Sequence, residues 1–410
     1  MKPDKPILTS LLQNDWYKFT MWYFIYRHFR DVRATFGFVN RTTKVSLSQL
    51  LDIGEVREQF EHARTVSFTK DELDWLFEFF PADFSNFIKN FRLPEYVLEQ
   101  NKDQLRIEFP GLWINSTQWE IPCLMIINTL ANRARTSSLT NTERTEMYDE
   151  GHRRLMVKTS VIKNYKYADQ FSFIDFGTRR CDSPEWHDHV VAVYKETIPK
   201  EIAGTSNCYL ARKYGLKAKG TRAHEPEMIM AALAGDDDEK LRQVPYKFCR
   251  LWSPSTYGYD FQVHLPDTYG SHGFFKFSPP DLAEWPAVRQ DSGDPFIIGM
   301  KTIRWWERHD QDLKTKTLTP SDGLNIKLML QLHAHFINLV RVIPGLGTNG
   351  TNDLPGIEPL SIVVKPIEAN GYPTVKLSDN IAKAMGPPEE VERCKRVFHY
   401  DESFNKACVY

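Results

Sequence analysis

The chain has 410 residues, a length beyond that at which one hydrophobic core usually stops growing, so we expect two domains. Its composition of 41% hydrophobic, 13% aromatic and 26% charged residues is typical of globular proteins and excludes a disordered chain. The 52 Lys and Arg residues nearly balance the 53 Asp and Glu residues, and the net charge of -1 argues against a dedicated nucleic-acid-binding protein.

The N-terminal sequence, MKPDKPILTSLLQNDWYK, lacks the apolar stretch of a signal peptide. No later window has the unbroken apolar length needed to cross a bilayer, so we expect no membrane partner. The six cysteines form no CxxC pair, which argues against a zinc module and against a disulfide scaffold. These features together predict a soluble protein of the reducing cytoplasm.

Residues 1–120 are predicted to mix helices with short strands. Thr69 and Glu72 form a capping box that begins a helix, and Pro81 ends that helix. The aromatic run from Trp75 to Phe80 is expected to be a core face, because such stripes at helical spacing usually pack inside. A further helix, apolar on one side, is expected from Pro122 to about Ala134.

From about residue 157 onward, short apolar runs alternate with helical segments. Phe171 to Ile174 indicates a buried strand, and Ser183 and Pro184 supply the N-cap and first turn of a helix that runs to about Thr197. A helix is expected from Leu324 to Phe336 and a buried strand from Leu339 to Ile343. This alternation predicts a parallel α/β architecture, either a barrel or a doubly wound sheet.

A β-hairpin is predicted near the C-terminus. Ser361 to Ala369 and Thr374 to Leu377 have the pattern of strands, and they are joined across Asn370 and Gly371, the strongest short hairpin signal. We expect this antiparallel piece to pack against the N-terminal domain.

Four segments combine glycine with Asp, Ser, Thr or Arg at a predicted strand end or turn. Because the loops after parallel strands share one face of the fold, these segments can converge on a single ligand. Glycine frees backbone amides for phosphates, and hydroxyl and carboxylate groups suit a sugar, so a phosphosugar or nucleotide site is one interpretation. Tight turns and helix caps are the alternative for each segment alone. The segments are 175–180, 204–207, 289–294 and 345–350.

Histidines give weaker signals. His224, followed by Glu225, is in isolation more often a packed or surface residue than a catalytic one. Glu225 could orient the imidazole ring only if the geometry allows it. His187 and His189 are spaced i, i+2 on a predicted helix and therefore point to different faces, which argues against a metal site.

Eight motifs, spread in order over nearly the whole chain, give a resemblance to a known family. They are NDWYK at 14–18, FIDFGTRR at 173–180, GTSN at 204–207, GTRAHE at 220–225, RQDSGDP at 289–295, SDGLN at 321–325, GLGTNGTND at 345–353 and VKLSD at 375–379. With these motifs the chain resembles the nicotinate phosphoribosyltransferase family.

The resemblance implies a fold and an oligomer. The expected fold is α/β: an α+β N-terminal domain over residues 1–120 that contributes to the dimer interface, and an irregular α/β barrel of the type II phosphoribosyltransferases over 121–360. Residues 361–410 would form a C-terminal hairpin and helix packed back on the N-terminal domain. The family also implies a homodimer with shared active sites.

The resemblance also assigns roles to individual residues. Tyr17, supplied by the neighbouring subunit, and Phe176 would sandwich the pyridine ring, an arrangement that suits a flat heterocycle. A neutral Ser206 favours nicotinate over nicotinamide, because an aspartate there would repel a carboxylate. The remaining roles are Arg179 and Arg289 at the nicotinate carboxylate, Asp291 and Asp322 at the ribose, Gly345, Gly347 and Thr348 at the phosphate, and His224, Glu225 and Asp291 in catalysis.

The expected reaction joins nicotinate to phosphoribosyl pyrophosphate, with Mg²⁺ as cofactor and ATP as co-substrate that phosphorylates His224. The sequence leaves the Mg²⁺ ligands unknown. The alternatives are a nicotinamide phosphoribosyltransferase, a more distant quinolinate enzyme, and a non-catalytic dimer that binds phosphoribosyl pyrophosphate.

Overall fold

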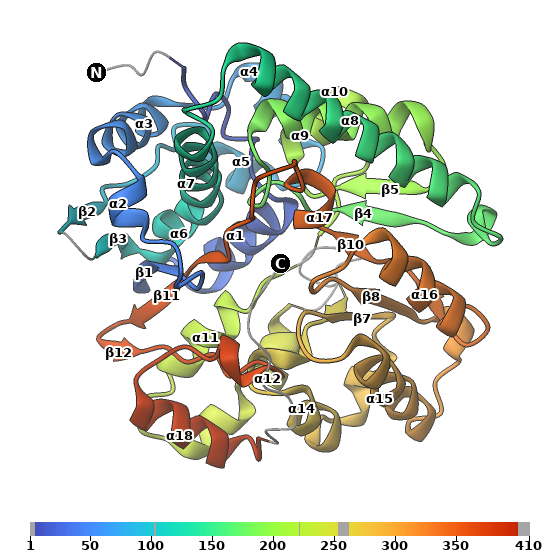
Figure 1. The fold of residues 1–410 in the computed structure, drawn as a ribbon. Helices are drawn as coiled ribbons and strands as arrows, with labels where there is room; N and C mark the ends of the chain where they lie inside the picture. The colour runs from blue at the N-terminus through green and yellow to red at the C-terminus, as the bar shows by residue number, and fades with distance from the viewer. Residues whose placement is uncertain (1–4, 102–103, 221, 253–261, 401–410) are drawn as a thin grey trace.

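A computed structural model describes residues 5–101, 104–220, 222–252 and 262–400. Thr221 of the GTRAHE motif, Cys408, and residues 1–4 and 401–410 at the ends of the two outer predicted domains lie outside the described residues. Within the described part, the strands form three sheets (Figure 1). One is antiparallel and two are parallel, and helices surround all three.

The antiparallel sheet joins the two ends of the chain. Its strand order is β12-β11-β1-β3-β2, and β11 pairs with β1 along most of its length. In Figure 1 the red C-terminal strand β11 accordingly lies beside the blue N-terminal strand β1. The strands are β1 (Arg33–Asn40), β2 (Val97–Gln100), β3 (Leu105–Leu112), β11 (Ile362–Ala369) and β12 (Tyr372–Pro373).

The predicted hairpin is present, with a shorter second strand than expected. Asn370 and Gly371 have φ values of 47° and 86°, and two successive positive φ angles are what a type I′ hairpin turn requires. The strand after the turn is Tyr372–Pro373 rather than Thr374 to Leu377. Pro373 has no backbone N–H to donate to the ladder, which favours an early end to the pairing.

The capping box at Thr69 is confirmed, but the aromatic stripe behind it is only partly a core face. Helix α4 (Lys70–Phe77) begins with both reciprocal capping hydrogen bonds. Leu76 and Phe80 are buried, whereas Phe77 and Phe79 are 40% and 49% exposed. The expectation of a continuous core face was therefore wrong, because the helix ends at Phe77 and the later aromatic residues do not continue its periodicity.

Two helices of the N-terminal half are buried almost all round. Helix α1 (Trp16–His28) is buried from Trp16 to Tyr26, and α7 (Glu120–Arg135) from Glu120 to Asn132. The predicted helix is therefore present, and its polar side chains are buried together with the apolar ones. Since both helices carry charged side chains into the interior, Lys18 and Glu120 need ionic partners there. The other elements of this half are α2 (Leu47–Leu50), α3 (Ile53–Thr65), α5 (Ala82–Ile88), α6 (Trp113–Ser116), η1 (Thr117–Trp119) and α8 (Asn141–Lys163).

The parallel sheets have the orders β10-β4-β5 and β6-β7-β8-β9. They confirm the predicted mixed α/β fold with parallel strands. The parallel strands among the described residues form two separate sheets. Closure into a barrel therefore stays a prediction, as do the domain boundaries. The strands are β4 (Phe173–Asp175), β5 (Ile202–Thr205), β6 (Val263–His264), β7 (Ala287–Gln290), β8 (Thr317–Pro320), β9 (Arg341–Val342) and β10 (Gly345–Leu346).

Helix caps follow the sequence closely in this half. Ser183 accepts a hydrogen bond from the Trp186 N–H and begins α9 (Pro184–Thr197), as predicted. Helix α16 (Ile326–Phe336) begins two residues later than expected, because Asn325 caps it. The remaining helices are α10 (Cys208–Tyr214), α11 (Glu225–Ala232), α12 (Asp238–Leu251), α14 (Ser271–Phe277), α15 (Pro295–Arg308), α17 (Thr348–Thr351) and α18 (Pro388–Val397).

Among the helices of the described residues, none is both long and apolar enough to span a bilayer. The five cysteines in this part of the chain are buried free thiols.

Candidate active site

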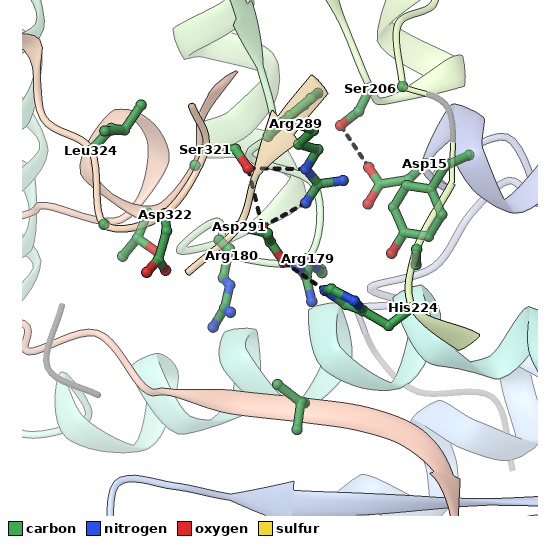
Figure 2. Close-up of a pocket in the computed structure, with 18 of the residues that line it drawn as sticks. Asp15, Arg179, Arg180, Ser206, His224, Arg289, Asp291, Ser321, Asp322 and Leu324 are labelled. Carbon is green, nitrogen blue, oxygen red and sulfur yellow. Dashed lines mark hydrogen bonds and ion pairs between the residues drawn. The ribbon is translucent and has the colours of Figure 1, made fainter. Parts of the chain in front are cut away.

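One pocket gathers the loops that follow five parallel strands (Figure 2). Phe176, Arg179 and Arg180 follow β4, Ser206 follows β5, Asp291 follows β7, Ser321 and Asp322 follow β8, and Gly347 and Thr348 follow β10. Helix α1 and strand β11 close the pocket with Tyr17, Val363 and Lys365. The structure therefore brings together all four glycine-containing segments that the sequence singled out.

The two aromatic residues of the predicted ring sandwich line this pocket from the same chain. Tyr17 is 7% exposed, and burial raises the pKa of its phenol well above 10, so the hydroxyl is neutral. Phe176 lies with its ring centroid 5.4 Å from the Arg289 guanidinium carbon. The resemblance predicted a tyrosine from the neighbouring subunit, but one chain already supplies Tyr17 to its own pocket. The homodimer itself stays a prediction.

Arg289 is fixed by hydrogen bonds to residues that follow the neighbouring strands β7 and β8. Its Nη2 donates to Asp291 Oδ1 (2.8 Å) and its Nε donates to Ser321 Oγ (2.9 Å). Arg179 is held differently: its backbone carbonyl accepts from Asn128 Nδ2 (2.8 Å), and its guanidinium Nη1 lies 3.9 Å from Glu120 Oε1. The Arg179 guanidinium is therefore near a carboxylate without a close hydrogen bond to it.

Asp175, the last residue of β4, ties two of the pocket loops together. Its Oδ2 accepts from Thr205 Oγ1 (2.6 Å) and lies 2.8 Å from His187 Nε2, while its Oδ1 accepts from the Gly177 N–H (3.0 Å). His187, for which the sequence suggested no role, is thus a buried partner of Asp175. His189 points elsewhere and contacts His152 at 3.0 Å, as the spacing of the two histidines predicted.

Asp15 is a pocket residue that sequence reasoning missed. Ser206 Oγ donates to Asp15 Oδ1 (2.7 Å), and the Trp16 N–H donates to the Ser206 carbonyl (2.7 Å), so the NDWYK segment is bound to the loop after β5 (Figure 2). Burial raises the pKa of Asp15. Its position before Tyr17 in a matching motif was the available signal.

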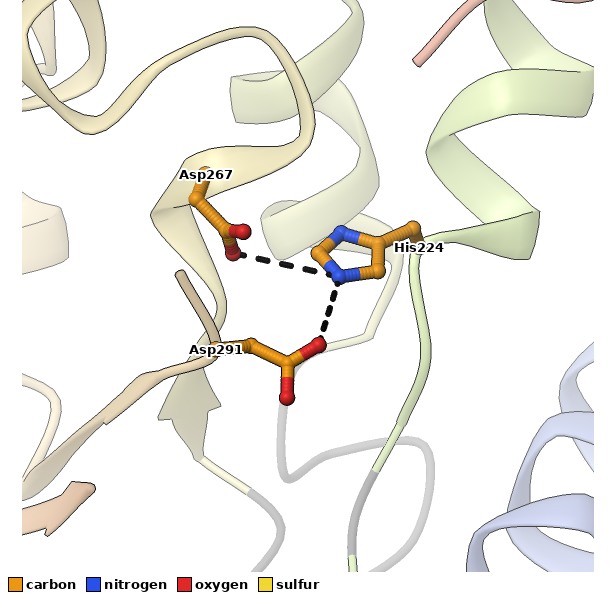
Figure 3. Close-up of side chains that lie close together, drawn as sticks. All are labelled: His224, Asp267 and Asp291. Carbon is orange, nitrogen blue, oxygen red and sulfur yellow. Dashed lines mark hydrogen bonds and ion pairs between the residues drawn. The ribbon is translucent and has the colours of Figure 1, made fainter. Parts of the chain in front are cut away.

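His224 lies at the N-cap of α11 and is almost completely buried. Its Nδ1 is 3.0 Å from Thr268 Oγ1, and its Nε2 is 3.1 Å from Asp291 Oδ2 and 3.9 Å from Asp267 Oδ1 (Figure 3). Burial, together with the nearby Lys376 ammonium, lowers the pKa of the imidazole to about 4. His224 is therefore neutral at pH 7, and a ring nitrogen keeps a lone pair for reaction.

The lowered pKa of His224 predicts a pH dependence of stability. Between its ordinary pKa of 6.5 and about 4, the unfolded chain binds a proton that the folded protein does not, so stability falls as the pH falls through this window. His224→Asn cannot titrate. Urea unfolding at pH 7 and pH 5 should show wild type losing about 2 kcal/mol relative to this variant. An equal loss in both proteins would contradict the assigned pKa.

Two predicted site residues lie outside the pocket. The Glu225 carboxylate accepts from Lys18 Nζ (2.7 Å), Trp113 Nε1 (2.6 Å) and Thr117 Oγ1 (2.6 Å). These three donors occupy the carboxylate, and the catalytic role of Glu225 stays a prediction. Gly345 does not line the pocket: a Cβ at Gly345 would lie 2.3 Å from the Phe176 ring, so this glycine makes room for that ring, and its phosphate role stays a prediction.

A group of basic side chains along the pocket was also missed. The pocket is lined by seven Lys and Arg residues against three Asp residues, an excess of positive charge that suits a polyanionic ligand. Lys383 Nζ donates to Asp322 Oδ1 (2.6 Å), and burial lowers the pKa of Lys376 to about 8. Lys376 belongs to the VKLSD motif and Arg180 to the FIDFGTRR motif, and these were the available signals. The residues not assigned from sequence are Arg41, Arg180, Lys365, Lys376 and Lys383.

Comparison with known proteins agrees with this geometry. The sequence model of the nicotinate phosphoribosyltransferase (NAPRTase) family matches residues 171–402, and that of the NAPRTase N-terminal domain matches residues 12–128. The two matched ranges contain every lining residue of the pocket.

Solved structures agree as well. Nicotinate phosphoribosyltransferase from Porphyromonas gingivalis is 28% identical, with 96% of this chain and 100% of that chain covered and a TM-score of 0.84. The enzyme from Vibrio cholerae is 28% identical over 97% and 95% of the two chains, with a TM-score of 0.87. A structure from Saccharomyces cerevisiae is also 28% identical, over 97% and 100%, with a TM-score of 0.81. The chain therefore belongs to the nicotinate phosphoribosyltransferase family.

Proposed function

We propose that this protein makes nicotinate mononucleotide and pyrophosphate from nicotinate and phosphoribosyl pyrophosphate, in the salvage of pyridine nucleotides. The observation that carries the proposal is one pocket in which an aromatic pair, Arg179 and Arg289, and further basic residues lie together. The aromatic pair and the two arginines suit an aromatic acid, and the further basic residues suit a sugar pyrophosphate. Family membership favours the same reaction.

Different pocket residues bind the base, the ribose and the pyrophosphate. Tyr17 and Phe176 hold the pyridine ring, and Arg179 and Arg289 hold its carboxylate, because a guanidinium donates in a fork that matches two carboxylate oxygens. Asp291 and Asp322 accept hydrogen bonds from the ribose hydroxyls. The basic residues hold the pyrophosphate.

The chemical step needs no covalent protein nucleophile. The lone pair of the pyridine nitrogen forms the new bond to ribose C1, and the bond from C1 to pyrophosphate oxygen breaks with its electron pair on the leaving group. Positive charge builds up at C1 meanwhile. Catalysis therefore comes from positioning and from the basic side chains that stabilise the departing pyrophosphate.

Mg²⁺ is the expected cofactor, and the residues present fit a divalent cation. Ligand atoms of His224, Asp267 and Asp291 lie within 4.8 Å of one another (Figure 3), and Asp267 Oδ1 has no hydrogen-bond partner among the described residues. Carboxylate oxygens are the ligands that Mg²⁺ prefers. When bound, the cation would neutralise charge on the departing pyrophosphate.

We further propose that ATP phosphorylates His224 and that hydrolysis of this phosphohistidine drives the reaction. A neutral ring nitrogen of His224 attacks the γ-phosphorus, and ADP leaves with the electrons of the broken bond. Water later releases inorganic phosphate. The low pKa of the imidazole and the adjacent basic residues support this role. The added negative charge would alter the hydrogen bonds that join His224 to Asp291 and Thr268.

The proposal is tested by product analysis. Purified protein is mixed with phosphoribosyl pyrophosphate, Mg²⁺ and either nicotinate or nicotinamide, with and without ATP, and mononucleotide is measured by mass spectrometry. We expect nicotinate mononucleotide, with ATP raising the yield. Equal or better use of nicotinamide would establish the alternative substrate, and no product from either base would leave a phosphoribosyl pyrophosphate-binding protein. Sedimentation analysis tests the expected homodimer, and fractionation of cells tests the cytoplasmic location.

Substitution of Ser206 by Asp should shift the choice of base. The new carboxylate would face both Asp15 and the carboxylate of nicotinate, and like charges at this range repel. We expect the ratio of kcat/KM for nicotinate to that for nicotinamide to fall about tenfold, or about 1.4 kcal/mol. Ser206→Ala removes the hydroxyl without adding charge and is the matched control, with a much smaller change in the ratio. An unchanged ratio in Ser206→Asp would refute the assignment.

A further inference from the structure

A buried network of charged side chains lies behind the pocket. Lys18 is 0% exposed, and its Nζ lies 2.9 Å from Glu120 Oε2 and donates to Glu225 Oε2 (2.7 Å) and Thr117 Oγ1 (2.9 Å). Burial alone would lower the pKa of this lysine, but the two carboxylates raise it, so Lys18 is charged. These contacts join α1, α7, η1 and α11 at one point.

Two pocket cations share the other side of Glu120. Lys365 Nζ donates to Glu120 Oε1 at 2.8 Å, whereas Arg179 Nη1 lies 3.9 Å from the same oxygen. Lys18 and Lys365 therefore hold one carboxylate oxygen each, and Arg179 is the third, outer cation. The nearby cations hold the pKa of Glu120 well below its usual range in spite of its burial.

The charges of this network do not cancel. Within this network, Lys18, Lys365 and Arg179 carry three positive charges, and Glu120 and Glu225 carry two negative ones. The pocket carboxylates Asp15 and Asp291 also attract Arg179. The surplus positive charge lies at the pocket end, since Arg179 and Lys365 line the pocket whereas Lys18, Glu120 and Glu225 do not. A buried surplus charge is costly unless an anion compensates it.

From this arrangement we propose that Lys18 is a positioning residue for nicotinate: by occupying Glu120, it leaves the Arg179 guanidinium free to bind the substrate carboxylate. The inference rests on the proposed function. Without Lys18, Glu120 Oε2 would lose its cation. The nearest remaining cation without a close hydrogen bond to a carboxylate is Arg179. The guanidinium would then move the short distance to a direct pair with Glu120 and away from the substrate.

A double-mutant cycle tests the proposal, because the predicted effect of Lys18 passes through Glu120. The KM for nicotinate is measured at saturating phosphoribosyl pyrophosphate for wild type, Lys18→Met, Glu120→Gln and the double variant. We expect Lys18→Met to raise the KM about tenfold, with a smaller change in kcat. In the Glu120→Gln background, where no carboxylate remains to capture Arg179, the same replacement should change the KM less than threefold.

The controls separate positioning from a general loss of stability. Thr117→Val removes a neutral partner of the same network, so it should lower the thermal unfolding temperature and leave the KM for nicotinate unchanged. Lys18→Arg keeps the charge and should restore most of the affinity. If Lys18→Met does not fold, the same comparison is made in a Glu225→Gln background, which removes one of the two carboxylates that Lys18 compensates.

The outcomes are distinct from those for the proposed function. If wild type does not convert nicotinate at all, the proposed function fails. If wild type converts nicotinate and Lys18→Met raises the KM by the same factor with and without Glu120, Lys18 acts by a route other than Arg179. An unchanged KM in Lys18→Met also overturns the inference.

Discussion

His224→Asn is expected to abolish the transfer of phosphate from ATP to the protein. Asparagine can still form hydrogen bonds to Thr268 and Asp291, the two partners of the imidazole, but it has no ring nitrogen to accept a phosphoryl group. The fold should therefore persist while the phosphohistidine is lost. With γ-phosphate-labelled ATP, wild type should show acid-labile labelling and the variant none.

Loss of the label should be accompanied by loss of coupling. We expect the rate of nicotinate mononucleotide formation by His224→Asn to be independent of ATP and at least about tenfold below the ATP-stimulated wild-type rate, or about 1.4 kcal/mol. His333→Asn is the matched control, because His333 is also buried but does not line the pocket, and it should be labelled like wild type. Labelling that persists in His224→Asn would place the phosphate on another residue.

Gly345→Ala is expected to displace the Phe176 ring and so to weaken binding of nicotinate. The new Cβ would lie 2.3 and 2.4 Å from two Phe176 ring carbons, closer than non-bonded atoms approach, and the ring must move. Gly345 cannot yield instead, since β10 is paired with β4, with Gly345 opposite Ile174. Forced repacking of this kind costs about 1–3 kcal/mol.

The measurable consequence is a loss of nicotinate binding. With Phe176 displaced from its place beside Arg289, we expect the KM for nicotinate to rise at least about tenfold, or about 1.4 kcal/mol, and the KM for phosphoribosyl pyrophosphate to change little. The double variant Gly345→Ala/Phe176→Leu relieves the clash, so its stability should recover while its affinity for nicotinate stays low. A normal KM in Gly345→Ala would show that Phe176 does not bind the ring.

Local elements of this fold were largely predictable. The capping box at Thr69, the cap at Ser183 and the turn at Asn370 and Gly371 all formed as expected, because each depends on residues within a few positions of one another. The full burial of α7 was not predictable in the same way. It depends on neighbours that arrive from elsewhere in the chain, including β11.

The candidate site shows the same division. The loops after β4, β5, β7 and β10 were expected to meet, since parallel strands present their carboxyl ends on one face, and the loop after β8 joins them in the pocket. Asp15 was missed, and so were the basic residues Arg41 just after β1, Arg180 after β4, Lys365 in β11, and Lys376 and Lys383 in the segment after β12. No local pattern distinguishes a lysine that lines a pocket from one on the surface, because its burial and its charged neighbours depend on distant segments of the chain.

The amino-acid sequence by itself determined the order of the motifs, and with it the resemblance to the family, together with the helix caps at Thr69 and Ser183 and the hairpin turn. Only the tertiary structure decided what Glu225 and Gly345 contact: Glu225 accepts a hydrogen bond from Lys18, 207 residues away, and Gly345 leaves room for the Phe176 ring. The physical reason is the distance along the chain between the residues that interact. Capping and turn formation are short-range effects, whereas the pairing of buried charges and the packing of rings depend on which distant segments the folded chain brings within a few ångströms.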